Sequence, residues 1–235
     1  VGSEMCIRDS KNKAHPELCA WDYLHSLEPD QGDLLEEISR KAIRDEVPII
    51  KKETGALLKT MVAAKRPRAI LEVGTAVGYS ALLMAGVMPA ECTITTIEKY
   101  EPRIPVAKAN FKRAGEESRI TLLEGDAEEI LKELEGSYDF IFMDAAKGQY
   151  IHWLPMILRL LSDGGILFSD NVLQDGDVVQ SRYAVERRDR TIHARMREYL
   201  YTLKHMEELE TSIIPIGDGA AISVKIEIEK ERVGK

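Results

Sequence analysis

The chain has 235 residues, of which 44% are hydrophobic and 31% charged, so a disordered chain is excluded. Its three cysteines, Cys6, Cys19 and Cys92, are too few for a small disulfide scaffold and favour a reducing compartment. No apolar run approaches the roughly 20 residues that span a bilayer, and no secretory signal pattern is present. We therefore expect a cytoplasmic protein without a membrane partner.

The formal net charge of −8 argues against a protein that coats nucleic acid indiscriminately. The charge is uneven, because residues 180–204 hold seven basic and three acidic side chains. That stretch carries +4 and the rest of the chain −12. Such a stretch is more often a solvated helix face than a binding surface, and charge alone leaves both interpretations open.

The N-terminal part of the chain is predicted to be helical. Residues 1–10 show no periodicity and are interpreted as an appended or misassembled segment. Helical patterning begins near Leu18 and resumes after a break at 29–32, with one apolar face predicted to hold Leu34, Leu35, Ile38, Ala42 and Ile43. Another helix is predicted at 53–64. No Gly/Ser-rich linker follows, so residues 11–64 are predicted to cap a main domain at 65–235.

Short apolar strands then alternate with helices. Strands are predicted at 69–73, 93–97, 120–123, 140–143 and 166–169, and helices at 80–88, 102–114, 128–134 and 150–161. This alternation predicts an α/β fold with a mostly parallel, doubly wound, Rossmann-like sheet. After a long helix at 191–208, the Asp-Gly turn at 217–219 separates two apolar runs, 212–216 and 220–226. The sheet is therefore predicted to end in an antiparallel hairpin.

The ends of the first three predicted strands suggest a cofactor site. Gly74 and Gly78 let backbone N–H groups approach a ligand, but the G-x-G-x-x-G spacing of dinucleotide sites is missing. Glu72 suits an ammonium group, Glu98 suits the two hydroxyls of a ribose, and Gly125-Asp126-Ala127 follows at the same sheet edge. A ligand with an amino acid and a ribose but no phosphate is S-adenosylmethionine. The alternative is a sheet edge carrying solvated acids.

The fourth and fifth strand ends suggest a chemical site. Asp144, Asp170 and Asn171 offer only oxygen ligands, a set that suits Mg²⁺, although Asp170-Asn171 alone also suits a turn. Lys147 lies three residues beyond Asp144. Beside a divalent cation its pKa should fall toward the range of a general base. The alternative is a solvated lysine.

The segments EVGTAVGYS, DAAKGQY, DNVL and IIPIGDGAAIS resemble the cation-dependent O-methyltransferases, relatives of the catechol and caffeoyl-CoA O-methyltransferases, over residues 33–225. Within that family the likeness is greatest to the bacterial tRNA 5-hydroxyuridine methyltransferases. The resemblance implies a class I methyltransferase fold, a homodimer, Mg²⁺ held by Asp144, Asp170 and Asn171, and Lys147 with Asp144 as catalytic residues. It also implies that the binding site of S-adenosylmethionine is lined by Ile50, Glu72, Gly74, Ser80, Glu98, Gly125, Asp126, Ala127 and Asp144.

The acceptor follows from the implied metal and from the basic stretch. A cation with two open positions selects vicinal oxygens, which both a catechol and 5-hydroxyuracil offer. Arg187, Arg188 and Arg190 come soon after DNVLQDGD, so we expect them to bind phosphates around a tRNA anticodon loop. Our hypothesis is methylation of the 5-hydroxyl of wobble 5-hydroxyuridine to give 5-methoxyuridine. The alternatives are a small catechol or phenylpropanoid acceptor, and a noncatalytic RNA-binding protein.

Overall fold

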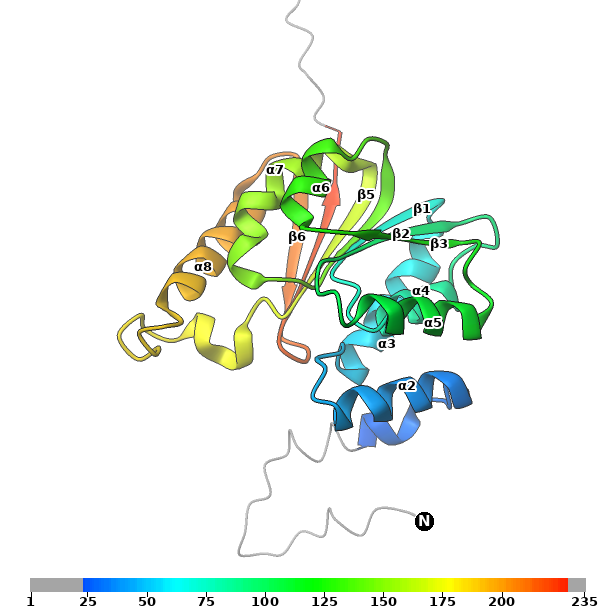
Figure 1. The fold of residues 1–235 in the computed structure, drawn as a ribbon. Helices are drawn as coiled ribbons and strands as arrows, with labels where there is room; N and C mark the ends of the chain where they lie inside the picture. The colour runs from blue at the N-terminus through cyan, green and yellow to red at the C-terminus, as the bar shows by residue number, and fades with distance from the viewer. Residues whose placement is uncertain (1–22, 228–235) are drawn as a thin grey trace, which may run out of the picture.

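Residues 23–227 are described by a computed structural model, and their strands form one seven-stranded sheet (Figure 1). The segment 1–10 and the start of helical patterning near Leu18 lie outside the described residues. The strand order is β3-β2-β1-β4-β5-β7-β6. The strands are β1 (Ala69–Val73), β2 (Thr93–Glu98), β3 (Ile120–Glu124), β4 (Tyr138–Met143), β5 (Leu161–Asp170), β6 (Leu209–Ile214) and β7 (Ala220–Lys225).

The sheet is parallel from β3 to β5 and antiparallel at its other edge. β7 pairs antiparallel with both β5 and β6, so it lies inside the sheet although it follows β6 in the chain, and β6 forms the edge. This arrangement confirms the predicted mostly parallel sheet with a terminal hairpin. β5 begins at Leu161 instead of residue 166, and β6 begins at Leu209 instead of residue 212, because pairing with neighbouring strands extends them beyond their apolar runs.

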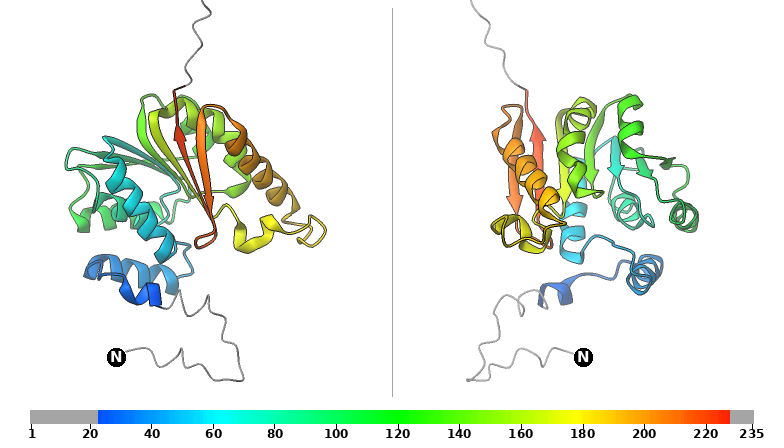
Figure 2. Two further views of the ribbon diagram at one scale, coloured as in Figure 1. Left: turned by 180° about the vertical axis from the view of Figure 1, so that it is seen from behind. Right: turned by 60° about the vertical axis from the view of Figure 1, so that its left-hand side comes forward.

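Helices cover both faces of the sheet (Figure 2). α3 (Lys52–Lys65), α4 (Tyr79–Ala85) and α5 (Ile104–Ala114) share one core with strand residues such as Ile70 and Phe140. α6 (Ala127–Glu133), α7 (Tyr150–Leu160) and α8 (Arg190–His205) share the other core with Leu71 and Ile141. Successive strand residues point to opposite faces, which explains the two cores. Within residues 23–227 no helix has the length and apolar character needed to cross a membrane.

α2 (Asp33–Arg44) packs against α4 and α5 and lies at the bottom of the molecule in Figure 1. Ile38 and Ala42 are buried, as the predicted apolar face requires. Ile43 is 67% exposed, so its predicted place on that face was wrong. A neighbouring residue on a helix is turned by about 100°, which carries Ile43 away from the stripe that holds Ala42.

Candidate active site

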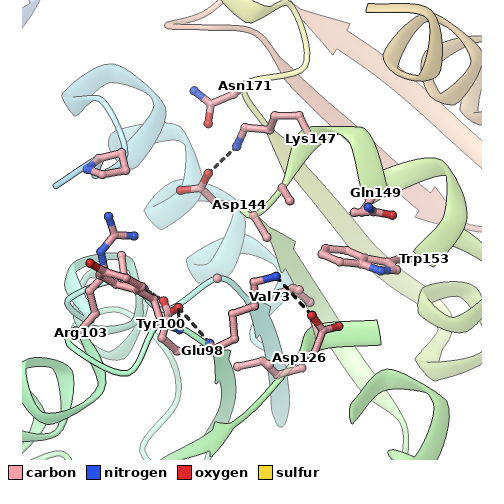
Figure 3. Close-up of a pocket in the computed structure, with 18 of the residues that line it drawn as sticks. Val73, Glu98, Tyr100, Arg103, Asp126, Asp144, Lys147, Gln149, Trp153 and Asn171 are labelled. Carbon is pink, nitrogen blue, oxygen red and sulfur yellow. Dashed lines mark hydrogen bonds and ion pairs between the residues drawn. The ribbon is translucent and has the colours of Figure 1, made fainter. Parts of the chain in front are cut away.

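A cavity of about 850 Å³ lies at the carboxyl ends of the parallel strands (Figure 3). The loops that follow β1, β2, β3, β4 and β5 all contribute to its wall. This position is the usual ligand site of open α/β sheets. Eight residues predicted to act at the site line it: Gly74, Glu98, Gly125, Asp126, Ala127, Asp144, Lys147 and Asn171.

Glu98 is fixed at one end of the cavity by backbone donors. Its Oε2 accepts from Ala76 N at 2.7 Å, and its Oε1 accepts from Lys99 N at 3.0 Å and Tyr100 N at 2.8 Å. A carboxylate held in this way keeps lone pairs for further donors. The arrangement therefore suits binding of a pair of hydroxyl groups, as expected for a ribose.

Three predicted cofactor residues lie outside the cavity lining. Ile50 is 6% exposed, and its neighbours Pro48, Ile49 and Lys51 line the cavity in its place. Glu72 is fully buried and accepts hydrogen bonds from Ser80 Oγ at 2.6 Å and from Thr96 Oγ1. Burial raises the pKa of Glu72 to about 7 despite these two donors. Glu72 and Ser80 thus stand behind the wall that Gly74 forms.

The raised pKa of Glu72 makes stability depend on pH. Between about 4.5 and 7 the folded protein holds a proton that the unfolded chain has released, so this group lowers the free energy of unfolding as pH rises. We expect Glu72→Gln to remove that loss. The free energy of unfolding of the Glu72→Gln variant, relative to that of wild type, should rise between pH 5 and pH 8 by at most on the order of 3 kcal/mol. Urea denaturation of both proteins across this pH range tests the expectation, and parallel pH profiles would contradict it.

The opposite end of the cavity holds the residues predicted to carry the chemistry. Lys147 Nζ lies 2.7 Å from Asp144 Oδ1 and 3.4 Å from the Tyr150 hydroxyl (Figure 3). Tyr150 is fully buried and donates to Met143 O at 2.9 Å, which ties the loop after β4 to its strand. Asp170 is 2% exposed and lies outside the cavity lining, next to Asn171, whose backbone N donates to its carboxylate at 2.7 Å. The ends of β4 and β5 therefore bring all four predicted residues together.

The protonation of this cluster differs from the expectation for Lys147. Burial alone would lower the pKa of Lys147, but Tyr150, Asp144 and Asp170 outweigh it and raise that pKa. The direction is opposite to the predicted one, because the prediction assumed a divalent cation that neutralises the carboxylates. Burial, and next the charge of Asp144, raise the pKa of Asp170 to about 7. An added positive charge would therefore stabilise the ionised carboxylates of Asp144 and Asp170.

The predicted metal ligands fit a hard cation by their chemistry. Among residues 23–227 no group of three His, Cys, Asp or Glu side chains is arranged to hold a metal ion. The predicted set has two carboxylates and one amide, so it is not a group of that kind. Its donors are all oxygen, as Mg²⁺ prefers. Burial first, and next the charge of Asp144, raise the pKa of Asp170, and a cation would offset both effects.

Several lining residues were missed by the sequence analysis. Asp218 was read only as a turn residue, and Lys51 carried no motif, yet Lys51 Nζ lies 2.5 Å from Asp218 Oδ1 at the cavity wall. Arg103 lies over the Tyr100 ring, 5.1 Å from its centroid, and its buried Nε finds no hydrogen-bond partner among the described residues. Trp153 lines the far side, as Figure 3 shows. No spacing rule connects these positions, which lie on different elements.

Of the arginines predicted to bind RNA, Arg187 and Arg188 lie on the segment between η2 (Gln174–Val179) and α8, and Arg190 is the first residue of α8. None of the three lines the cavity. Arg187 is exposed, and Arg188 forms exposed ion pairs with Glu186 at 3.0 Å and Asp189 at 3.4 Å. Arg190 donates to Val185 O at 3.2 Å. Further along the stretch, backbone carbonyls accept from Arg195, Arg197 and Lys204. Four of the seven basic side chains of this stretch thus donate to backbone carbonyls within the fold.

Comparison with known proteins places these features in a family. Residues 25–226 match the family model described as O-methyltransferase. A catechol O-methyltransferase of Niastella koreensis is 36% identical over 130 residues, which span 53% of this chain and 58% of that enzyme. A Staphylococcus aureus structure provisionally named a caffeoyl-CoA O-methyltransferase aligns with a TM-score of 0.82 and 32% identity over 88% of this chain and 99% of that chain. The SAH-bound methyltransferase PaMTH1 of Podospora anserina aligns with a TM-score of 0.80 and 25% identity, over 97% and 100% of the two chains.

Proposed function

The chain belongs to the O-methyltransferase family and is an S-adenosylmethionine-dependent enzyme, and we propose that it methylates a hydroxyl group next to a second acceptor oxygen, with Mg²⁺ as cofactor. One observation carries this proposal: the cavity joins Glu98 at one end to Asp144, Lys147 and Asn171 at the other. Mg²⁺ held by Asp144, Asp170 and Asn171 would lower the pKa of the acceptor hydroxyl and hold both acceptor oxygens.

The chain's own groups divide the remaining tasks. Glu98 would bind the ribose hydroxyls, and the loop at Gly74 would let the methionine part approach the backbone. The acceptor oxygen forms a bond to the methyl carbon while the carbon–sulfur bond breaks and its electron pair stays on sulfur. The hydroxyl proton leaves the acceptor, and Lys147 would accept it in its neutral amine form, which the charge of a cation beside Asp144 and Asp170 would favour. Trp153 and the loops around it would exclude water from the reacting atoms.

We propose 5-hydroxyuridine at the wobble position of tRNA as the acceptor. Support comes from the exposed Arg187 and Arg188, and from Tyr183, which is 88% exposed on the same segment. Arginines bind phosphates, and an exposed tyrosine can stack on an unpaired base. Arg103, whose Nε is buried and has no hydrogen-bond partner among the described residues, adds a guanidinium at the cavity wall that suits an anionic acceptor group.

A small catechol or phenylpropanoid ester is the second candidate. It is favoured by the catechol enzyme of Niastella koreensis and by the structure provisionally named a caffeoyl-CoA O-methyltransferase. Family membership argues against the noncatalytic RNA-binding protein. One assay separates the candidates: labelled S-adenosylmethionine is incubated with hydroxyuridine-containing tRNA, catechol or caffeoyl-CoA, with Mg²⁺ or with EDTA. Label on the small acceptors alone would contradict the tRNA proposal, and EDTA-resistant transfer would contradict the cation.

Removal of one exposed arginine should affect RNA binding selectively. We expect Arg188→Ala to raise the KM for tRNA about three- to tenfold and to reduce the salt dependence of binding, because one phosphate contact is lost. The kcat should stay near the wild-type value, since Arg188 lies outside the cavity lining. Lys132→Ala, an equally small change at an exposed helix side chain on α6, is the control. An unchanged KM for tRNA in the Arg188 variant would contradict its role.

The predicted homodimer also stays a proposal. The exposed Tyr23, Leu24 and Leu27 precede α2 and offer apolar surface for such contacts. Light scattering with the full chain measures the mass in solution. A monomer at micromolar concentration would contradict a stable dimer.

A further inference from the structure

The turn between β6 and β7 is attached to the loop that carries Asn171. Leu173 N donates to Asp218 O at 2.8 Å, and Val172 N donates to Gly219 O at 3.0 Å. β7 continues this pairing, with Ala220 opposite Asp170. The turn therefore follows the proposed ligand loop residue by residue, although 47 positions separate Asn171 from Asp218 in the chain.

A side-chain contact adds to this attachment. Asn171 Nδ2 donates to Asp218 Oδ2 at 3.0 Å. An ionised carboxylate only accepts hydrogen bonds, so it selects the amide orientation in which the NH₂ group faces Asp218. The amide oxygen is then directed elsewhere. Figure 3 shows that oxygen on the side of Asp144 and Lys147, with the nitrogen pointing away from them.

Asp218 is itself held in place from the N-terminal helices. Its other oxygen, Oδ1, lies 2.5 Å from Nζ of Lys51, the residue that precedes α3. The side chain of Asp218 is only 14% exposed. Its two oxygens thus have separate tasks, since one pairs with Lys51 and the other accepts from Asn171.

Close packing keeps the turn in this position. A Cβ on Gly217 would lie 2.4 Å from Thr54 Oγ1, and a Cβ on Gly219 would lie 2.4 Å from Leu173 Cγ. Both glycines have positive φ, 54° and 86°. Only glycine allows the backbone to approach α3 and Leu173 this closely. The turn is therefore a fixed support and not a flexible loop tip.

We propose that Asp218 is a positioning residue that presents the amide oxygen of Asn171 to the cation. The inference rests on the proposed function, because it assumes that a divalent cation binds at Asp144, Asp170 and Asn171. An amide coordinates Mg²⁺ through its oxygen and not through its NH₂ group, so a flipped Asn171 would be lost as a ligand. Groups that orient a metal ligand typically contribute 10- to 100-fold to metal affinity.

The test measures Mn²⁺ binding to the full chain by electron paramagnetic resonance, with Mn²⁺ as the probe for a hard divalent cation. We expect Asp218→Ala to weaken Mn²⁺ binding about 10- to 100-fold. Lys51→Met should change it by less than about threefold, because the contact to Asn171 stays. Glu210→Ala removes an exposed carboxylate from the same hairpin and should leave Mn²⁺ binding unchanged, which controls for charge alone.

A second readout needs no metal. In ¹⁵N-labelled protein, the side-chain amide signal of Asn171, identified by its loss in Asn171→Ser, should shift and exchange faster in Asp218→Ala and stay in place in Glu210→Ala. Wild-type Mn²⁺ affinity in Asp218→Ala, or an unmoved amide signal, would overturn the positioning role. If wild type binds no Mn²⁺ while the amide signal still moves, the cation of the proposed function is refuted. The ligand-orienting role falls with it, and only the hydrogen bond stands.

Discussion

Asp170→Asn is expected to lower the rate of methyl transfer at least about 10³-fold while the protein stays folded. Asp170 ends β5 and is 2% exposed, so a water molecule or a small anion from solvent cannot easily take the place of its carboxylate. The change removes one of the two negative charges proposed to hold the cation. A 10³-fold loss corresponds to about 4 kcal/mol of transition-state stabilisation. The measurement is the initial rate with saturating S-adenosylmethionine, Mg²⁺ and the acceptor identified by the labelling assay.

The same substitution separates function from stability. Burial and the charge of Asp144 raise the pKa of Asp170 to about 7, so the ionised carboxylate destabilises the metal-free folded protein above that pH. The neutral asparagine removes this cost, and the variant should unfold at an equal or higher temperature than wild type at pH 8. Asp163→Asn, on the same strand with a side chain 61% exposed, is the matched control and should keep full activity. Activity of Asp170→Asn within tenfold of wild type would contradict the proposed site.

Among substitutions that add one methyl group to the cavity wall, we expect Gly74→Ala to lower the free energy of unfolding the most. Gly74 has a φ of 108°, and a Cβ there would lie 2.1 Å from the backbone oxygen of Asp144. The neighbouring backbone cannot move freely, because Asp144 N donates to Val73 O at 3.0 Å and Gly74 N to Ile97 O at 3.1 Å. We expect a loss of about 3 to 5 kcal/mol in the free energy of unfolding, measured by urea denaturation.

Gly136→Ala provides the matched control for this loss. Gly136 has nearly the same φ, 111°, but a Cβ there would meet no atom within 4 Å. Its variant carries the backbone strain without the clash, and we expect a loss of about 1 to 2 kcal/mol. The difference between the two variants isolates the contact with Asp144. Equal losses would show that the loop after β1 can move away from β4. S-adenosylmethionine binding should weaken only in the Gly74 variant.

The parallel part of the fold was predictable because short apolar runs alternate with helices, and the inner strands β1 and β4 are buried on both faces. Ile70 and Leu71, for example, belong to the two separate cores, so neither face of β1 needs polar residues. The start of β5 was not predictable in the same way. Residues 162–165 are Ser-Asp-Gly-Gly, which do not continue the apolar run that begins at Ile166, and only pairing with β4 extends the strand to Leu161.

The candidate site was predictable to the extent that it follows the strand ends. Parallel strands end at one edge, so Glu98, Asp144 and Lys147 could be assigned to one cavity from sequence. Glu72 was predicted to contact the cofactor, but its side chain lies on the opposite face of β1 from Leu71 and Val73 and is fully buried outside the cavity lining. Lys51 and Asp218 could not be found, because their meeting depends on antiparallel pairing and on the placement of α3.

The inside position of β7 has a consequence for how the protein is made. β7 leaves the ribosome after β5 and β6, yet it pairs with β5, and the turn before it brings Asp218 to Asn171. A nascent chain that has emerged only as far as α8 leaves β5 as an open edge and lacks this support. The cavity is then walled by the earlier strands alone. Translation must therefore reach the final hairpin before the site is complete, and a chain released early would hold most of the catalytic residues without the support that β7 provides.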